Sequence, residues 1–376
     1  MAKKRYILLL ALMLAASYTY FNHFYKSLSQ NTSLADLSEP QVSAACGNEC
    51  SRNEDRVKPT LNTSLITHEH SVNYLFQLEK CNTCLAGKRL ISVHPDWICG
   101  LERLGNKMFM IAAAVGAAAL WNIGFVLPHD RENCTWLSSL HEVFIRIQTS
   151  IPVLPYHVIV AWKTDVEKGF TTYGAVQPSY DQNISISGFR QSWKYFVDER
   201  SQKAVREMFR FKKTYVTYAN AVLRNASLAF NLSNPIFIGL HMRIGDLDSE
   251  PFVKYGYQRA SKMFYRKAID VVQKRFNHSG SLIYIAASDT ISAAKEMLRE
   301  ANVRIYWSTG TRFQDLACLA SCNHSIISGG SYGFWAAWLA NGETYYFSNF
   351  ARPGSEFYSK FDSLNFYLPN WLPLGY

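Results

Sequence analysis

The chain has 376 residues, 48% of them hydrophobic and 14% aromatic, and its formal net charge is +10. This length and apolar content fit one large domain or two ordinary ones, with most of the chain packed around a core. Because no Lys/Arg block dominates and the sequence carries no zinc-finger or RNA-binding motif, the positive charge favours an anionic small molecule over nucleic acid as the partner.

The N-terminus has the pattern of a membrane anchor. Three cations at 3–5 precede an apolar run over 6–21, and aromatic residues gather at its far end. Cations followed by one apolar segment are the positive-inside arrangement, and about 16–20 residues is near the length that spans a bilayer. We expect a cytoplasmic tail at 1–5 and a signal-anchor transmembrane helix at 6–25. The alternative is a signal peptide cleaved near residue 17.

The next segment, 26–90, is polar and rich in turn-forming residues, which is typical of a stem. Sequons of the form N-x-S/T support a lumenal location, because this pattern is the glycan acceptor of secreted chains. They begin at Asn31, Asn62, Asn133, Asn183, Asn225, Asn231, Asn277 and Asn323. We expect the segment around Asn323 to lie close to the core.

Eight cysteines are present: Cys46, Cys50, Cys81, Cys84, Cys99, Cys134, Cys318 and Cys322. The C-x3-C and C-x2-C pairs among the first four indicate zinc in a cytosolic protein but disulfides in an oxidising lumen, which we favour. The connectivity does not follow from the sequence. Cys318 and Cys322 share a face if their segment is helical, yet Cβ directions along a helix do not favour a bridge.

The folded body opens with a helix expected within 101–122. Its apolar run at 110–120 is too short to span a membrane and suits a buried core helix. A short buried strand follows at 123–128. The middle of the chain, about 135–235, is less regular, with an apolar run interrupted by prolines and then one long helix over 198–227.

The last third alternates between strands and helices. Strands are expected at 235–242, 281–288, 303–308, 324–328 and 344–348, with helices at 261–276, 290–301, 313–322 and 331–340. Such alternation with short links predicts a parallel, doubly wound sheet, which binds ligands at the carboxyl ends of its strands. His241, Ser288, Asp289 and the 328–333 loop all fall at that edge, so one ligand site is predicted there.

The loop S-G-G-S-Y-G at 328–333 joins a strand to a helix. Gly329 and Gly330 allow a tight turn, and the free N–H groups and positive dipole end of the helix suit a phosphate. The alternative is an ordinary strand-to-helix turn. The sequence contains neither a P-loop nor a Rossmann glycine motif.

A second candidate is the stretch H-M-R-I-G-D-L-D, which begins at His241. Arg243 has the geometry to clamp a phosphate with two N–H groups. Asp246 is placed to orient Arg243 or to accept a proton, and His241 to hydrogen-bond a sugar or phosphate. Asp246 and Asp248 also form the D-x-D pattern with which many glycosyltransferases hold Mn²⁺. The alternative is a solvent-exposed Arg–Asp ion pair at the end of a strand, with no role in ligand binding.

Three segments together resemble the α-1,2-fucosyltransferases of glycosyltransferase family 11. They are H-M-R-I-G-D at 241–246, R-L-G-N-K-M at 103–108, and the long block from Phe313 to Phe350. The resemblance covers 95–376. It implies an α/β, GT-B-like fold of two Rossmann-like halves that follows the anchor helix and stem.

The resemblance assigns an acceptor-side half to 91–235 and a GDP-fucose-binding half to 236–376. It also implies residue roles: a diphosphate clamp at Arg243, a guanine contact at Asp315 and β-phosphate support at Ser331, with Gly330 and Gly333 as further donor-binding positions. For the catalytic base we choose Asp246 first and His241 second, because both lie beside the clamp. Two positions depart from the family pattern, because Ile244 replaces its second Arg and Lys107 replaces its Gln.

These features together predict a single-pass type II Golgi membrane enzyme with a lumenal catalytic domain. It is expected to transfer L-fucose from GDP-fucose to a galactose hydroxyl of a glycan, with inversion, without a metal, and in α-1,2 linkage. Two alternatives stay open. One is a catalytically degenerate lumenal glycan-binding glycoprotein, suggested by Ile244. The other is a metal-dependent GT-A glycosyltransferase that uses Asp246 and Asp248.

Overall fold

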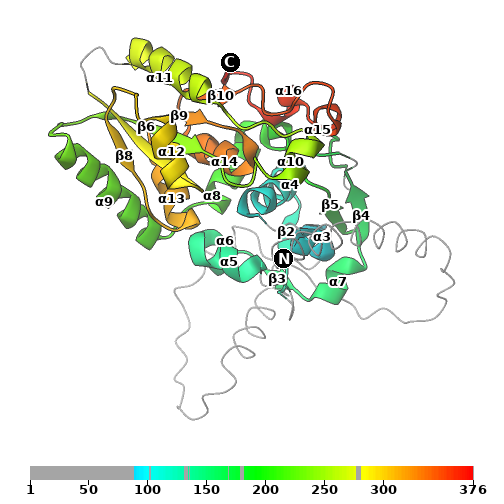
Figure 1. Cartoon of the computed structure of the whole chain (residues 1–376). Coiled ribbons are helices and arrows are strands. Elements are labelled where there is room, and N and C mark those ends of the chain that lie inside the picture. Colours follow the sequence, from blue (N-terminus) through cyan, green and yellow to red (C-terminus); the bar gives the residue numbers. More distant parts are fainter. Residues whose placement is uncertain are drawn as a thin grey trace, which may run out of the picture. The chain divides into compact units, whose positions relative to one another are not determined.

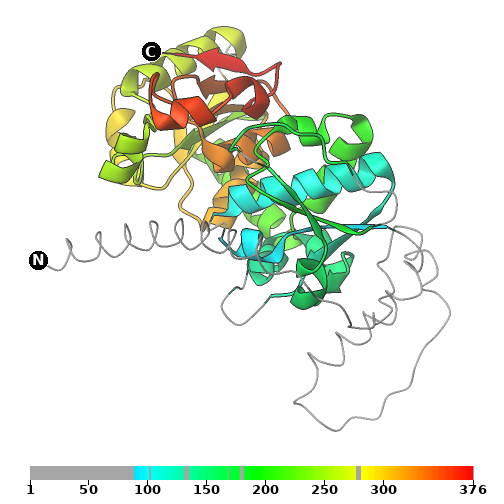
Figure 2. The same cartoon turned by 90° about the vertical axis from the view of Figure 1, so that its right-hand side faces the viewer.

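Two parallel sheets with intervening helices make up the part of the chain that the structure describes (Figure 1). The computed structural model describes residues 89–100, 103–130, 134, 136–167, 169–177, 182–276 and 281–375. All of them fall within a single compact unit. Figure 2 shows the same elements after a quarter turn, with the first sheet in cyan to green and the second in light green to red.

Several predicted features lie outside the described residues. They are the tail at 1–5, the anchor at 6–25, nearly all of the stem at 26–90, the cysteines Cys46, Cys50, Cys81 and Cys84, and the sequons at Asn31, Asn62, Asn133 and Asn277. Of the described sequon asparagines, Asn183 is half-buried, and Asn225, Asn231 and Asn323 are exposed. The expectation that the segment around Asn323 lies close to the core is confirmed, because Cys322 and Ser325 are buried, although Asn323 itself is exposed.

The first sheet has the strand order β3-β2-β1-β5-β4, and all its pairings are parallel. Its strands are β1 (Leu90–Val93), β2 (Gly124–Pro128), β3 (Val153–Leu154), β4 (Lys163–Val166) and β5 (Ile184–Ser187). Its helices are α3 (Pro95–Gly100), α4 (Leu104–Trp121), α5 (Trp136–Val143), α6 (Ile145–Thr149), α7 (Tyr156–Val160), η2 (Trp193–Phe196) and α8 (Glu199–Met208).

The second sheet has the order β11-β10-β9-β6-β7-β8 and is also wholly parallel. Its strands are β6 (Ile236–Met242), β7 (Leu282–Ser288), β8 (Ile305–Trp307), β9 (His324–Ile327), β10 (Thr344–Phe347) and β11 (Leu372–Leu374). Its helices are α9 (Lys213–Ala229), α10 (Glu250–Tyr255), α11 (Lys262–Phe276), α12 (Ile291–Met297), α13 (Arg312–Ala320), α14 (Gly330–Ala340), α15 (Glu356–Lys360) and α16 (Ser363–Phe366).

The order of the second sheet is that of a doubly wound Rossmann sheet. Counted from β6, the strands run 3-2-1-4-5-6 across the sheet, so the winding direction reverses between β6 and β9. β6 and β7 are almost fully buried, as expected for parallel strands covered on both faces. The predicted GT-B-like fold of two α/β halves with parallel sheets is thus confirmed for the described residues. At the start of α11, Ser261 Oγ accepts from Phe264 N at 3.2 Å.

The helix α4 lies in the core rather than at the surface. It is the one helix among the described residues that is long and apolar enough to cross a membrane, yet 72% of its apolar window is buried inside the fold. Phe109 on α4 packs against Phe334 and Trp335 on α14, with ring centroids 4.5 and 5.0 Å apart. The expectation of a buried core helix here is confirmed, and its apolar cluster joins the two halves.

One prediction in the middle of the chain is wrong. The single helix expected over 198–227 is two helices, α8 and α9, separated at Phe209–Lys212. The break forms because Phe211 pairs in extended conformation with Phe144, and Lys212 N donates to Val143 O at 2.9 Å. The rings of Phe209 and Phe211 both pack on Phe144. Burial of these rings outweighs the helical preference of the segment.

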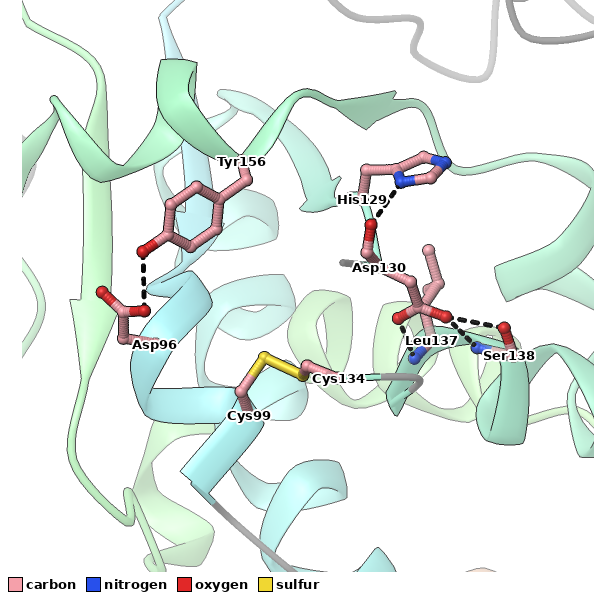
Figure 3. The surroundings of a disulfide bond; sticks show 8 residues. All are labelled: Asp96, Cys99, His129, Asp130, Cys134, Leu137, Ser138 and Tyr156. Carbon is pink, nitrogen blue, oxygen red and sulfur yellow. Dashed lines mark hydrogen bonds between the residues drawn. A yellow bond between two sulfur atoms is a disulfide. The ribbon is translucent and has the colours of Figure 1, made fainter. Parts of the chain in front are cut away.

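A disulfide joins Cys99 at the end of α3 to Cys134, which lies ahead of α5 (Figure 3). Beside it Tyr156 donates to Asp96 at 2.7 Å, and Asp130 accepts from Leu137 N at 2.8 Å. The sequence did not predict this pairing, and the cysteine pairs for which disulfides were predicted, 46/50 and 81/84, lie outside the described residues. Cys318 and Cys322 are buried free thiols. Cys322 lies just after α13, which ends at Ala320, and its Sγ is 3.3 Å from Cys318 O rather than bonded to Cys318 Sγ.

We expect removal of the bridge to destabilise the fold. Cys99→Ser should cost ~3 kcal/mol of unfolding free energy, because the cross-link closes a loop of moderate length in the unfolded chain. Urea denaturation of the purified chain measures this. Peptide mapping after thiol blocking in denaturant, without reductant, should recover the Cys99–Cys134 peptide and blocked Cys318 and Cys322. A cross-linked Cys318–Cys322 peptide would contradict the assignment.

Candidate active site

The site lies at the point where the second sheet reverses its winding. β6 and β9 are neighbours there, and the carboxyl ends of both strands open onto the same edge. Arg243 follows β6, and Gly329 and Gly330 follow β9 at the start of α14. Ligands of doubly wound sheets bind in this crevice, and the N-terminus of an 11-residue helix adds free N–H groups and a positive dipole end.

Arg243 is held in place by both its backbone and its side chain. Its N–H donates to Ser328 Oγ at 2.9 Å. Its guanidinium makes a two-pronged contact with Asp246, with Nε–Oδ1 at 3.0 Å and Nη2–Oδ2 at 2.8 Å. A Cβ added at Gly330, whose φ is +80°, would lie 2.9 Å from Arg243 Nη1. Glycine suits this position for two reasons: it adopts the left-handed backbone conformation readily, and it leaves space for the guanidinium of Arg243.

A second arginine shares the same carboxylate. Arg103, at the N-cap of α4, approaches Asp246 with Nη2–Oδ2 at 2.5 Å. Both guanidiniums lie over the ring of Phe252, 5.6 Å away for Arg103 and 5.8 Å for Arg243. Partial burial raises the pKa of Asp246, but the hydrogen bonds and charges of the two arginines outweigh it and lower the pKa to about 2. Two cations and one anion leave the cluster with a net positive charge.

His241 lies beneath this cluster rather than within it. The residue is buried, and a Cβ added at Gly333 would lie 2.6 Å from His241 Nδ1. Its ring faces Tyr332 at 5.5 Å, and its Nδ1 lies 3.5 Å from Ser328 Oγ. Burial and, secondly, the charge of Arg243 lower the pKa of His241 to about 3, so the ring is neutral. Gly333 thus makes room for a neutral histidine packed under α14.

Ser331 connects the second sheet to the first. Its hydroxyl donates to Asn106 Oδ1 at 2.7 Å, and the same oxygen accepts from Gln191 Nε2 at 2.9 Å. A Cβ at Gly105 would lie 2.7 Å from Ser331 Oγ and from backbone atoms of α14. Trp335 Nε1 also donates to Gly105 O at 3.0 Å. The N-termini of α4 and α14 are therefore in direct contact.

Asp315 stands further along the same edge, in the first turn of α13. Its Oδ1 accepts from Ser308 Oγ at 2.6 Å and from Gly310 N at 3.2 Å. Burial raises the pKa of Asp315 in spite of these two hydrogen bonds. Tyr332, which faces His241, donates its hydroxyl to Arg312 O at 2.5 Å, so it links the start of α13 to the centre of the site.

The predicted residues are thus gathered at one sheet edge, but not all at one point. Arg243, Asp246, Gly330 and Ser331 meet at the reversal between β6 and β9, with His241 and Gly333 below them and Asp315 to the side. Sequence reasoning assigned no individual role to Arg103, Asn106 or Gln191. The R-L-G-N-K-M segment was the signal that contained the first two.

Asp248, Asp289 and Ile244 have separate roles. Asp248 is more than half exposed and pairs with Arg259 at 3.1 Å, so it and Asp246 bind different arginines. Asp289 accepts from Ile244 N at 2.8 Å and thereby holds the loop after β6. The Ile244 side chain is buried in the core of the second sheet. Within the described ranges, no group of three or more His, Cys, Asp or Glu is arranged to hold a metal ion.

Comparison with known proteins gives a consistent set of relatives. The model of glycosyl transferase family 11 matches residues 73–374. The chain is 30% identical over 296 residues to galactoside alpha-(1,2)-fucosyltransferase 1 of Saimiri sciureus, covering 76% of this chain and 74% of that protein. The protein of the same name from Leontocebus fuscicollis is 29% identical over the same length and coverage.

Two solved structures also match part of the chain. POFUT1 in complex with GDP gives a TM-score of 0.41 at 9% identity, covering 69% of this chain and 98% of that chain. The fucosyltransferase NodZ from Bradyrhizobium gives a TM-score of 0.44 at 10% identity, covering 67% of this chain and 93% of that chain.

The shared carboxylate predicts a specific pH dependence of stability. A carboxyl group whose pKa is lowered in the folded state stabilises the fold above its unfolded pKa, and this contribution is lost as the pH falls through the folded-state value. Asp246→Asn should therefore cost on the order of 1–3 kcal/mol at pH 7. The difference from the wild type should shrink below about pH 4, towards the pKa of about 2 that Asp246 has in the fold. Urea denaturation across this range tests it, and a constant difference would contradict it.

Proposed function

This chain belongs to glycosyltransferase family 11, and we propose that it transfers L-fucose from GDP-fucose to a galactose hydroxyl of a glycan acceptor, in α-1,2 linkage. The observation that carries the proposal is the cluster of Arg243 and Arg103 on one carboxylate, between the N-termini of two helices. Relatives named galactoside alpha-(1,2)-fucosyltransferase support the choice of donor sugar, acceptor and linkage.

The net positive cluster is built to receive a diphosphate. Guanidiniums bind phosphate oxygens through parallel N–H groups, and a helix N-terminus offers backbone N–H groups to the same oxygens. In the proposal Arg243 and Arg103 bind the diphosphate, while Gly330 and Ser331 at the start of α14 support the β-phosphate. Asp246 aligns the two arginines before the donor arrives, which reduces the ordering cost of binding.

The remaining donor contact is to the base. A carboxylate is a good acceptor for the N–H groups of guanine, and Asp315 lies in the first turn of α13 at the same sheet edge. Ser308 and Gly310 fix one of its oxygens. We therefore assign guanine recognition to Asp315, and we place Gly333 with the donor site because it allows His241 to support α14 from below.

The reaction is a single displacement with inversion at fucose C1. The acceptor oxygen forms the new C1–O bond, the bond from C1 to the β-phosphate oxygen breaks, and GDP leaves with that electron pair. Positive groups at the leaving diphosphate stabilise its developing charge, which is the largest expected catalytic contribution. Asp246 and His241 were the predicted bases. Since both have pKa values far below neutrality, we assign positioning roles to them.

No metal is required in this proposal, because arginines provide the charge that Mn²⁺ would otherwise provide. The D-x-D alternative is not favoured, since Asp246 is bound by two arginines and Asp248 by Arg259. The degenerate glycan-binding alternative is not favoured either. Ile244, which suggested it, packs in the core and leaves the arginine cluster intact.

The cellular setting is part of the proposal. We place the chain in the Golgi membrane as a single-pass type II protein with tail 1–5, anchor 6–25 and stem 26–90. We assign acceptor binding to 91–235 and donor binding to 236–376. The Cys99–Cys134 disulfide supports a lumenal body, because disulfides persist in oxidising compartments.

We expect both arginines to be needed for transfer of radiolabelled fucose by the full chain in detergent. Arg243→Ala should lower kcat by roughly 10²–10³, the usual loss for one group that stabilises developing charge. Arg243→Lys should recover only part of it, because a lysine lacks the two-pronged geometry. Arg103→Ala should raise the Kd for GDP as well. Arg259→Ala, which removes only the partner of Asp248, is the control and should remain active. Wild-type activity in Arg243→Ala would refute the proposed role.

We also expect transfer to be insensitive to chelation. Because the leaving diphosphate is neutralised by side chains, incubation with excess EDTA should leave the initial rate within about twofold. A loss of activity that added Mn²⁺ restores would support the D-x-D alternative instead.

A further inference from the structure

Glu167 is a half-buried carboxyl group at the carboxyl end of β4, on the first sheet. Its Oε2 accepts from the backbone N–H of Arg190, and its Oε1 accepts from the Tyr195 hydroxyl at 3.3 Å. Its own N–H donates to Ser187 O at 3.4 Å, so it lies beside the end of β5. Glu167 is thus fixed at the sheet edge by three contacts.

The buried arginine beside Glu167, Arg190, forms its ion pair with a different carboxylate. Arg190 is 1% exposed and forms an ion pair with Asp165 through Nη2. Its Nε donates to Ser187 O at 2.8 Å, and its Nη1 lies 3.4 Å from the Tyr195 hydroxyl. Its φ of +53° is uncommon for a residue with a side chain. Since Asp165 neutralises the guanidinium, the Glu167 carboxylate is left with neutral hydrogen-bond donors.

Two series of contacts connect Glu167 to the proposed donor site, which contains Ser331 and the cluster of Arg103, Arg243 and Asp246, called the donor cluster below. Gln191, which follows Arg190, donates to Asn106 Oδ1, and the same oxygen accepts from Ser331 at the start of α14. Gln191 N also donates to Phe170 O at 3.2 Å, which ties the two loops together.

The second series runs through aromatic rings. Phe170, three residues after Glu167, lies 6.3 Å from the Tyr255 ring on α10. The same helix carries Phe252, over which the guanidiniums of Arg103 and Arg243 lie. Through these contacts Glu167 lies at the carboxyl edge of the first sheet, one residue removed from the Gln191–Asn106–Ser331 contact, in the half that the proposed function assigns to the acceptor.

We propose that Glu167 is the catalytic residue that accepts the proton of the acceptor hydroxyl. The inference rests on the proposed transfer of fucose. As the acceptor oxygen bonds to fucose C1 and GDP departs, the hydroxyl proton moves to a Glu167 oxygen, and solvent later removes it. The balance is GDP-fucose plus acceptor giving fucosylated acceptor, GDP and one proton, with no oxidant or further reactant.

The surroundings of Glu167 suit this task. Burial raises its pKa to about 8, against the hydrogen bonds and charge of Arg190 and the hydrogen bond from Tyr195, while the charge of Asp165 raises it further. A general base works best when its pKa lies near the working pH. Phe170 and Phe189 stack at 4.3 Å, and Trp97 meets Phe189 edge-on at 6.2 Å, so an aromatic cluster lies next to Glu167 and Arg190 in the chain.

Glu167→Gln in the full chain tests the proposal. The amide oxygen still accepts from Arg190 N–H, but the side chain cannot take up a proton. We expect kcat to fall by roughly 10²–10⁴, with GDP affinity unchanged. For the wild type, kcat/KM should rise with pH through a midpoint near 8, set by Glu167, and this rise should vanish in Glu167→Gln. Glu142→Gln, an exposed carboxyl bonded to Tyr215, is the matched control.

The outcomes separate the inference from the proposed function. If wild type transfers fucose and Glu167→Gln transfers equally with the same pH profile, Glu167 is structural and the inference is wrong. If wild type binds GDP but transfers no fucose, the proposed function itself fails. Should Glu167→Gln not fold, Glu167→Asp replaces it in the test. That variant should keep the pH-dependent rise at a lower kcat, and a flat profile with full kcat would overturn the inference.

Discussion

The contact between the N-termini of α4 and α14 governs the rest of the site. Gly105 has no side chain, so the backbone of α14 approaches α4 closely, and the Trp335 indole closes the contact by donating to Gly105 O. Beneath it the rings of Phe109, Phe334 and Trp335 bury apolar surface from both halves. Because α4 follows β1 and α14 follows β9, this one contact brings the carboxyl edges of the two sheets face to face. A larger residue at position 105 would separate them.

The cation pair on Asp246 is a consequence of that contact. Arg243 comes from the loop after β6, and Arg103 from the cap of α4, some 140 residues earlier in the chain. The chain has an isoleucine where the resembling family has its second arginine, and this Ile244 contributes to the core instead. The two positive charges on Asp246 therefore come from different halves of the fold. Ile244 removes neither of them, because its side chain packs in the core.

The sequence predicts best where local pattern and tertiary fold agree. The last third alternates regularly, and every expected strand and helix there is present within a few residues, with the strand ends at one edge. The middle of the chain is poorly predicted, because its elements depend on distant partners. The helix break at Phe211 needs Phe144. The short strand β5 is stabilised by pairing with β1, and β4 by pairing with β5.

The same limit applies to the site. Arg243 and Ser331 lie in motifs whose residue types already indicate an anion, so they could be selected from the sequence. Glu167 lies in no motif. Its pKa is raised chiefly by burial in the fold, and its hydrogen bonds from Arg190 and Tyr195 form only when distant parts of the chain meet. Arg103 was visible only as part of a weak motif. Its ion pair with Asp246 forms only when the chain folds, because the two residues are far apart in the sequence.

The two free thiols, Cys318 in α13 and Cys322 just after it, have a consequence for folding. Cys318 and Cys322 are buried in the second sheet's helix layer, and burial raises the pKa of Cys318 to about 12, so neither is a reactive thiolate once the fold is complete. In the unfolded chain both are ordinary thiols competing with Cys99 and Cys134 for the same oxidants. Under oxidising conditions the C-terminal half must therefore fold before its two thiols form disulfides with Cys99 or Cys134. Variants that slow this folding would accumulate mispaired disulfides even when their native state is stable.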